Sequence, residues 1–151
     1  MKTWKAATIA LISAGLSGCA ANHPPTPPMA PDPTPTELAA ADYGQYPQKY
    51  EEVVKGWTED SMKDPASVIF KKISKPRKEY MYAERKPVYG YSVCTLLNAK
   101  NSYGGYTGNQ VYWLMIRDGA VLRSQSLTDN LTRGTAGIIS IGHFVNCDDG
   151  K

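Results

Sequence analysis

A helical repeat of apolar residues lies between two prolines, Pro47 and Pro65. Pro47 suits the first turn of a helix, and Pro65 cannot continue one. The residues between them place apolar or small side chains at three- and four-residue steps, which is the spacing of one helix face. These residues are Tyr46, Tyr50, Val53, Val54, Trp57 and Ser61. We therefore predict an amphipathic helix that begins near residue 46 and packs on an apolar surface.

After Pro65 the chain has the short apolar or alternating runs that are typical of β-strands. These runs cover residues 66–73, 87–98, 110–117 and 120–127. Asp118-Gly119 predicts a two-residue hairpin turn, since both central residues must accept positive φ. Residues 138–147 fit a last strand or a short helix, and we expect a strand. The order predicts an α+β fold, with one N-terminal helix packed on an antiparallel sheet of four or five strands.

Residues 1–18 have the pattern of a signal peptide, with Lys2 and Lys5 before an apolar run over residues 6–16. That run is too short to cross a bilayer, which takes about 20 residues. Leu16-Ser17-Gly18-Cys19 resembles the lipobox of bacterial lipoproteins, which implies that Cys19 is lipidated and begins the mature chain. Ala20 after the cysteine implies an outer-membrane anchor facing the periplasm, under the sorting rule of enterobacteria. A plain secretory signal and a retained membrane segment are the alternatives.

Residues 19–45 are expected to be a linker, because seven prolines fall between residues 22 and 36 with few apolar side chains. A polyproline segment of this length extends about 45 Å at 3.1 Å per residue. The alternatives are a flexible tether and a segment recognised by a proline-binding module. Residues 46–151 then form a single small domain.

Charge gives little support for a nucleic-acid partner. The chain has 17 basic and 14 acidic residues, and removal of Lys2 and Lys5 with the signal peptide leaves 15 basic residues and a formal charge of +1. No broad positive field remains, so we expect no nucleic acid partner.

The three cysteines make an even pair once Cys19 is assigned to the lipid. In an oxidising periplasm we expect a Cys94–Cys147 disulfide, which the chain-entropy model values at roughly 4 kcal/mol. Two unpaired buried thiols or a metal site are the alternatives. The chain lacks a CxxC spacing and has few histidines, so we expect no metal and no cofactor.

Residues 98–108 combine glycines, asparagines and tyrosines between two predicted strands. A cysteine a few residues before Asn-Ala-Lys-Asn-Ser, then an aromatic residue and Gly-Gly-Tyr-x-Gly, resembles small uncharacterised bacterial envelope proteins. Lys63-Asp64-Pro65-x-Ser67 resembles a second part of their pattern. Two positions depart from it: Thr95 follows the cysteine where glycine is expected, and Asn109 follows the last glycine where an aromatic residue is common. The resemblance implies that the chain belongs to this group of envelope proteins, and it implies no particular activity.

This segment has two readings. It is either a structural loop or a surface that binds peptidoglycan or another envelope glycan through rings, amides and one charge. The candidate binding residues are Asn98, Lys100, Asn101, Tyr103 and Tyr106.

Residues 71–86 are rich in cations, with two tyrosines among them. Such a segment can meet anionic glycan, lipid headgroups or an acidic protein, or it can be a solvated strand pair whose charges resist aggregation. The candidate basic patch consists of Lys71, Lys72, Lys75, Arg77, Lys78, Arg85 and Lys86.

We expect that this chain is not an enzyme. The sequence has no GxSxG, HExxH or phosphate-loop motif, and His143 lies in an apolar stretch that favours a structural role over general-base catalysis. Cys94 as a nucleophile paired with His143 would need a free thiol, which the expected disulfide does not leave. The expectation is a lipid-anchored, non-catalytic binding or scaffolding protein of the cell envelope. The alternatives are an accessory lipoprotein subunit of a secretion or conjugation machine, and a cell-wall enzyme.

Overall fold

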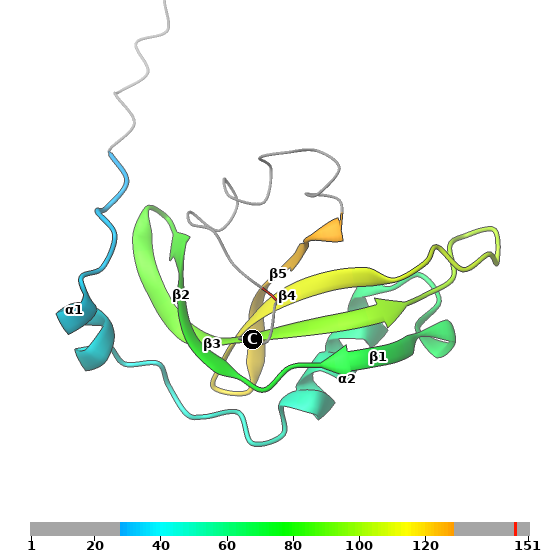
Figure 1. Ribbon diagram of the computed structural model, residues 1–151, viewed down its shortest axis with the longest axis horizontal. Helices are drawn as coiled ribbons and strands as arrows, with labels where there is room; N and C mark the ends of the chain where they lie inside the picture. Colours follow the sequence, from blue (N-terminus) through cyan, green and yellow to red (C-terminus); the bar gives the residue numbers. More distant parts are fainter. Residues whose placement is uncertain (1–27, 129–146, 148–151) are drawn as a thin grey trace, which may run out of the picture.

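The computed structural model describes residues 28–128 and Cys147, and these form an antiparallel sheet of five strands with two α-helices and one disulfide (Figure 1). The strands pair in the order β1-β3-β4-β5, and β2 also pairs with β3. The helices are α1 (Pro35–Ala40) and α2 (Tyr50–Ser61), with a 3-10 turn η1 (Pro65–Ser67). The strands are β1 (Ile69–Ile73), β2 (Arg77–Ala83), β3 (Lys86–Asn98), β4 (Gln110–Arg117) and β5 (Ala120–Ser126). The predicted antiparallel sheet and disulfide are confirmed.

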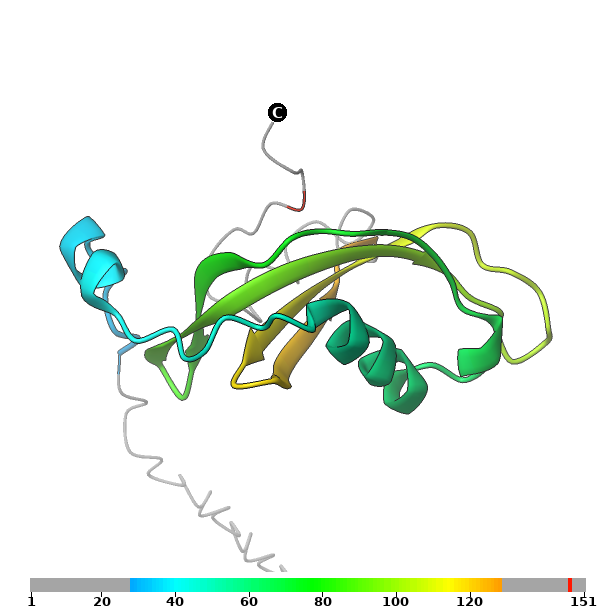
Figure 2. The same ribbon diagram turned by 90° about the horizontal axis from the view of Figure 1, so that it is seen from below.

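Strand β3 is the centre of the sheet because it has three partners. Its first half pairs with β2, from Ala83↔Lys86 to Arg77↔Ser92, and its second half pairs with β1. Strand β4 covers only Tyr91 to Leu97 of its other edge. Strand β2 and residues 86–90 of β3 form a two-stranded hairpin, here named the arm, most of which therefore extends past β4 (Figures 1 and 2).

The arm begins at Gly90, where β3 passes very close to β4. A Cβ atom at Gly90 would lie 2.8 Å from the carbonyl oxygen of Ile116 and 2.8 Å from the sulfur of Met115. Glycine therefore permits a backbone approach that a larger residue would block.

Helix α2 packs on one face of the sheet. Val54 is fully buried against Val93, Leu114 and Ile116, and the ring of Trp57 lies 5.2 Å from that of Tyr112. The helix is shorter than the sequence predicts. It begins at Tyr50, whose N–H bonds to the carbonyl of Pro47 before the helix, and its C-cap is Met62.

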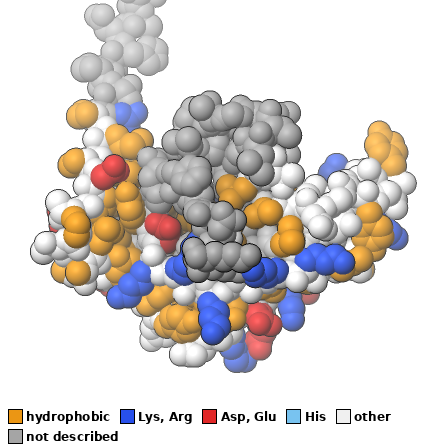
Figure 3. Space-filling view, in the orientation of Figure 1, with side chains coloured by type: hydrophobic (Ala, Val, Ile, Leu, Met, Phe, Trp, Pro, Cys, Tyr) orange, Lys and Arg blue, Asp and Glu red, His pale blue; other side chains and the backbone are white. Residues whose placement is uncertain are grey.

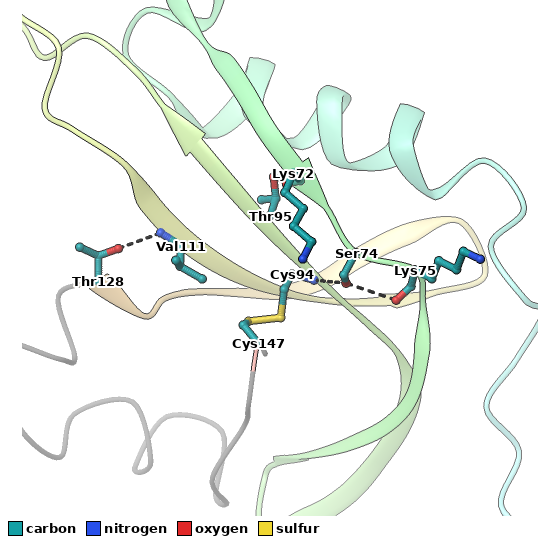
Figure 4. The surroundings of a disulfide bond; sticks show 8 residues. All are labelled: Lys72, Ser74, Lys75, Cys94, Thr95, Val111, Thr128 and Cys147. Carbon is teal, nitrogen blue, oxygen red and sulfur yellow. Dashed lines mark hydrogen bonds between the residues drawn. A yellow bond between two sulfur atoms is a disulfide. The ribbon is translucent and has the colours of Figure 1, made fainter. Parts of the chain in front are cut away.

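The other face carries the disulfide. Met81, Cys94, Trp113 and Met115 form a buried cluster there, and Cys147 packs against it. Cys94 and Cys147 lie 5.5 Å apart between Cα atoms, so the bond attaches residue 147 to the middle of β3 (Figure 4). Beside it, Ser74 continues the β1 pairing: its N–H donates to the carbonyl of Cys94, and its Oγ accepts from the Cys94 N–H.

Both tight hairpins have two-residue turns with positive φ. Asp118 and Gly119 have φ of 50° and 81°, as the sequence predicts, and Glu84 and Arg85 have φ of 48° and 68°. The strand predicted over residues 66–73 begins later, at Ile69, because Pro65–Ser67 form η1. The strand or helix expected over residues 138–147 lies outside the described residues, apart from Cys147.

Residues 28–46 differ from the expected linker, because they turn back onto the arm. The N–H of Ala30 donates to the carbonyl of Arg85 at 2.9 Å, and Tyr43 is 6% exposed. We call this segment the strap. Between its two docked parts lies α1, which is held by a Thr34–Glu37 capping box and buries none of its own residues. The sequence analysis anticipated neither α1 nor these contacts, because the contacts are made with residues far along the chain.

Candidate functional site

Residues 99–109 connect β3 to β4 as an irregular hairpin. The N–H of Asn101 donates to the carbonyl of Gly105 at 2.8 Å, and the N–H of Thr107 donates to the carbonyl of Ala99 at 3.2 Å. Lys100 and Tyr106 form an isolated antiparallel bridge. The loop thus extends the β3–β4 ladder and has a defined shape.

Asn101 organises the tip of this loop. Its Oδ1 accepts hydrogen bonds from the N–H groups of Tyr103, at 2.9 Å, and Gly105, at 3.1 Å, and its carbonyl accepts from Gly104 at 3.0 Å. This is the local side-chain-to-backbone bonding typical of asparagine in turns. Asn101 is therefore a structural residue of the loop, and its side-chain oxygen is already engaged.

The rings at the tip remain accessible. Tyr103 is 96% exposed and Tyr106 is 48% exposed. The Lys100 ammonium lies 5.5 Å from the centre of the Tyr106 ring, and the Lys63 ammonium donates to Ser102 Oγ at 3.0 Å. Two aromatic rings and two cations thus meet on one exposed end of the molecule. This surface can stack on a sugar or peptide and pair with a carboxylate.

Asn98 does not share that surface. It ends β3 opposite Ile69, and within the described part of the chain its buried Oδ1 has no hydrogen-bond partner. The structure therefore brings together Lys100, Tyr103 and Tyr106 and separates Asn98 from them.

The basic residues also divide into two groups. Lys71, Lys72, Lys75, Arg77 and Lys78 are exposed along β1 and the start of β2. Arg85 and Lys86 lie at the far end of β2, about 20 Å away at 3.3 Å per residue. Figure 3 shows Lys and Arg side chains spread over this side of the molecule with other residue types between them. The sequence segment is thus a pair of strands with charged edges, and its cations do not form one patch.

The opposite end of the molecule holds a cluster that the sequence did not reveal. Six tyrosines pack ring against ring on the arm, the adjoining part of β3 and the strap, and we call them the tyrosine face: Tyr43, Tyr46, Tyr80, Tyr82, Tyr89 and Tyr91. The ammonium of Lys78 lies 4.8 Å from the centre of the Tyr43 ring. Alternation of Tyr80 with Tyr82, and of Tyr89 with Tyr91, was the available signal, because such pairs share one face of a strand.

Asp32 joins the strap to this cluster. Its Oδ1 accepts from the hydroxyl of Tyr82 at 2.9 Å and from that of Tyr80 at 3.4 Å. Burial, together with the hydrogen bond to Asp32, raises the pKa of Tyr82 to about 12. A neutral phenol that donates to a carboxylate is the stable state of this contact.

Arg117 holds the second docked part of the strap. Its guanidinium forms a salt bridge with Asp42 at 2.7 Å, and it donates to the carbonyls of Asp42, at 2.7 Å, and Tyr89, at 2.9 Å. The N–H of Gly44 and the Arg117 guanidinium lower the pKa of Asp42. One arginine thus links β4, the arm and the strap.

Other predicted residues lie outside the described part of the chain, among them Cys19 and His143. In residues 28–128 and Cys147, three or more His, Cys, Asp or Glu side chains do not gather at any one point as metal ligands would. None of the described helices has the length and apolar character needed to span a membrane.

Comparison of the chain with protein-family models, with curated proteins and with solved structures gives no match.

Proposed function

We propose that this chain is a lipid-anchored protein of the bacterial cell envelope, whose domain binds an envelope component without catalysis through the tip of the β3–β4 loop. The lipobox supports the anchor, and the surface of Lys100, Tyr103 and Tyr106 supports the binding site. The observation that carries the proposal is the 96% exposure of Tyr103 on a loop ordered by Asn101. An aromatic ring held out by an ordered loop loses little conformational entropy when it binds.

The shape of the molecule supports this assignment. The loop tip and α1 lie at opposite ends of the described structure (Figures 1 and 2). The strap begins at Pro28, and eight residues lie between it and Cys19, so this tether would span about 28 Å at the 3.1 Å per residue of a polyproline conformation. An anchor at Cys19 would therefore hold the arm near an outer membrane and direct Tyr103 into the periplasm. Peptidoglycan is the ligand that fits this placement.

Pelleting with purified peptidoglycan sacculi tests the binding site. We expect the mature chain to sediment with sacculi, Tyr103→Ala to lose most of this retention, and Lys100→Gln to lose part of it. Leu122→Ala, which removes another exposed apolar side chain (45% exposed) on β5, is the matched control and should bind normally. Equal retention of Tyr103→Ala and wild type would show that the loop is only structural.

The anchor has its own test. Cys19→Ser should move the protein from the membrane fraction to the soluble periplasmic fraction, and mass spectrometry of the wild-type chain should find acyl groups on Cys19. An unmodified Cys19 in the mature protein would refute lipidation without affecting the sacculus experiment.

An accessory subunit of an envelope machine is a second candidate. The exposed cations along β1 and the start of β2 favour it, because they offer a charged edge to an acidic protein. Crosslinking in cells separates the two functions. A single protein adduct that is lost on charge reversal at Lys71 and Lys75 supports the subunit, and sacculus binding without an adduct supports the glycan binder.

A further inference from the structure

The outer part of the strap, residues 28–34, rests on the arm through a small set of polar contacts. The backbone N–H of Ala30 reaches the carbonyl of Arg85, and two residues later Asp32 reaches the hydroxyls of Tyr80 and Tyr82. Pro31 and Pro33 flank Asp32. Proline fixes φ near −65°, so both prolines favour an extended backbone, and in this segment Ala30 and Asp32 both contact the arm.

This arrangement is a mode of peptide recognition. Extended proline-rich segments bind surfaces lined with aromatic residues because they lose little entropy on binding. The arm supplies aromatic rings, two phenol donors and one backbone acceptor. A charge-assisted hydrogen bond from a phenol to a carboxylate selects an acidic residue at the centre of the segment.

The outer strap is held less firmly than the inner strap. Pro28, Met29, Pro31 and Asp32 are exposed, and Ala30 and Pro33 are half-buried. By contrast, the inner strap, residues 41–46, buries Tyr43 among other rings and is bonded to Arg117. The two parts are joined by α1, which buries no residue, so the outer part can leave while the inner part stays.

We propose that the surface formed by Tyr80, Tyr82 and the Arg85 carbonyl is a binding site for an extended segment of the form x-Pro-Asp-Pro. The chain's own residues 30–33 occupy the site, and a partner protein that carries such a segment displaces them. The site is separate from the β3–β4 loop, and neither proposal depends on the other.

A labelled synthetic peptide of residues 28–34 tests this with the full mature chain. Asp32→Asn removes the carboxylate of the internal competitor and leaves the arm intact. We expect the peptide to bind the Asp32→Asn chain about tenfold or more tightly than wild type, since a hydrogen bond to a charged group is lost from the competitor alone. The same peptide with Asn in place of Asp should bind the Asp32→Asn chain correspondingly more weakly.

Removal of the phenol donors should abolish the gain. Asp32→Asn combined with Tyr82→Phe should return peptide binding to the wild-type level or below it, whereas Asp32→Asn with Tyr50→Phe, the matched control on α2, should bind like Asp32→Asn alone. Tyr80→Phe repeats the test at the more exposed hydroxyl if Tyr82→Phe disturbs folding.

Three outcomes would overturn the proposal. In the first, wild type and Asp32→Asn bind the peptide equally. In the second, the Asp and Asn peptides bind the Asp32→Asn chain equally. In the third, the wild-type chain forms dimers that the peptide does not dissociate. The last outcome would identify the strap of a second copy as the occupant.

Discussion

The two ends of the domain both carry tyrosines, but they use them in opposite ways. At the β3–β4 loop, Tyr103 stands 96% exposed and its backbone is fixed by Asn101. On the arm, Tyr82 is 5% and Tyr43 6% exposed, and their rings and hydroxyls are engaged within the molecule. The difference teaches that residue type alone does not identify a binding surface. A tyrosine is open to a ligand without any rearrangement of the domain where the backbone, and not the ring, carries the local contacts.

The largest expected difference between the two ends concerns stability. Tyr43→Ala removes a buried ring that contacts Tyr89, Tyr91 and Lys78, so we expect a loss of about 3 kcal/mol in the free energy of unfolding. Tyr103→Ala should change it by less than about 0.5 kcal/mol. Urea unfolding of both variants measures this. Similar losses for both would mean that the loop tyrosine is also packed, and the contrast would be wrong.

A second change should loosen the arm and leave the loop end intact. Gly90→Ala places a methyl group against the backbone carbonyl of Ile116, and overpacking of this kind costs about 2 kcal/mol. Hydrogen exchange should then rise over β2 and residues 86–90 before it rises at residues 99–109. Gly56→Ala in α2 is the control, because its Cβ meets no atom within 4 Å and alanine favours helix. A uniform rise in exchange would show that the arm is not a separate unit.

The tyrosine face should also respond to alkali. The native pKa of Tyr82 is raised to about 12, above its ordinary value near 10, because burial and the bond to Asp32 favour the neutral phenol. The folded state therefore keeps a proton that the unfolded state loses, so the stability from this contact is complete below about pH 10 and declines as pH rises toward 12. Tyr82→Phe should remove that part of the decline, which unfolding at a series of pH values measures. Parallel curves for the two proteins would contradict it.

The smallest expected effect is at low pH, in the inner strap. The pKa of Asp42 is lowered by the Gly44 N–H and by Arg117, so its contribution is present above the ordinary value of about 4 and is lost as pH falls through the native pKa. Asp42→Asn should be less stable than wild type at neutral pH and equal to it in strong acid. A difference that persists unchanged in acid would assign the effect to packing.

The regular elements could be predicted where the pattern is local. Strand β4 matches the run over residues 110–117, because six of its side chains are hydrophobic and a two-residue Asp-Gly turn ends it. The turn between β2 and β3 could not be recognised in this way, since its residues Glu84 and Arg85 are of types that are uncommon at positive φ. The start of β1 was misplaced because Pro65–Ser67 close a 3-10 turn, which a pattern of apolar residues does not distinguish from a strand.

The candidate loop could be located from its glycines and asparagines, but the roles of its residues could not. The sequence grouped Asn98 with Tyr103, whereas the register of β3 places Asn98 at the end of the strand, opposite Ile69, with its Oδ1 buried. The strap was missed for a related reason. Its proline-rich residues cannot form a core by themselves, and the surface that they cover is made by residues some 50 positions away, as in the Asp32–Tyr82 pair.

The Cys94–Cys147 bond gives the exposed loop a property that concerns proteolysis. The two cysteines are 53 positions apart, and the whole β3–β4 loop lies inside the covalent ring that they close. A protease that cuts at Tyr103 therefore produces two fragments that remain joined, each still holding one strand of the β3–β4 pair. In electrophoresis, a nicked molecule would migrate as a single species until a reductant is added. The surface around the cut would stay attached to the domain.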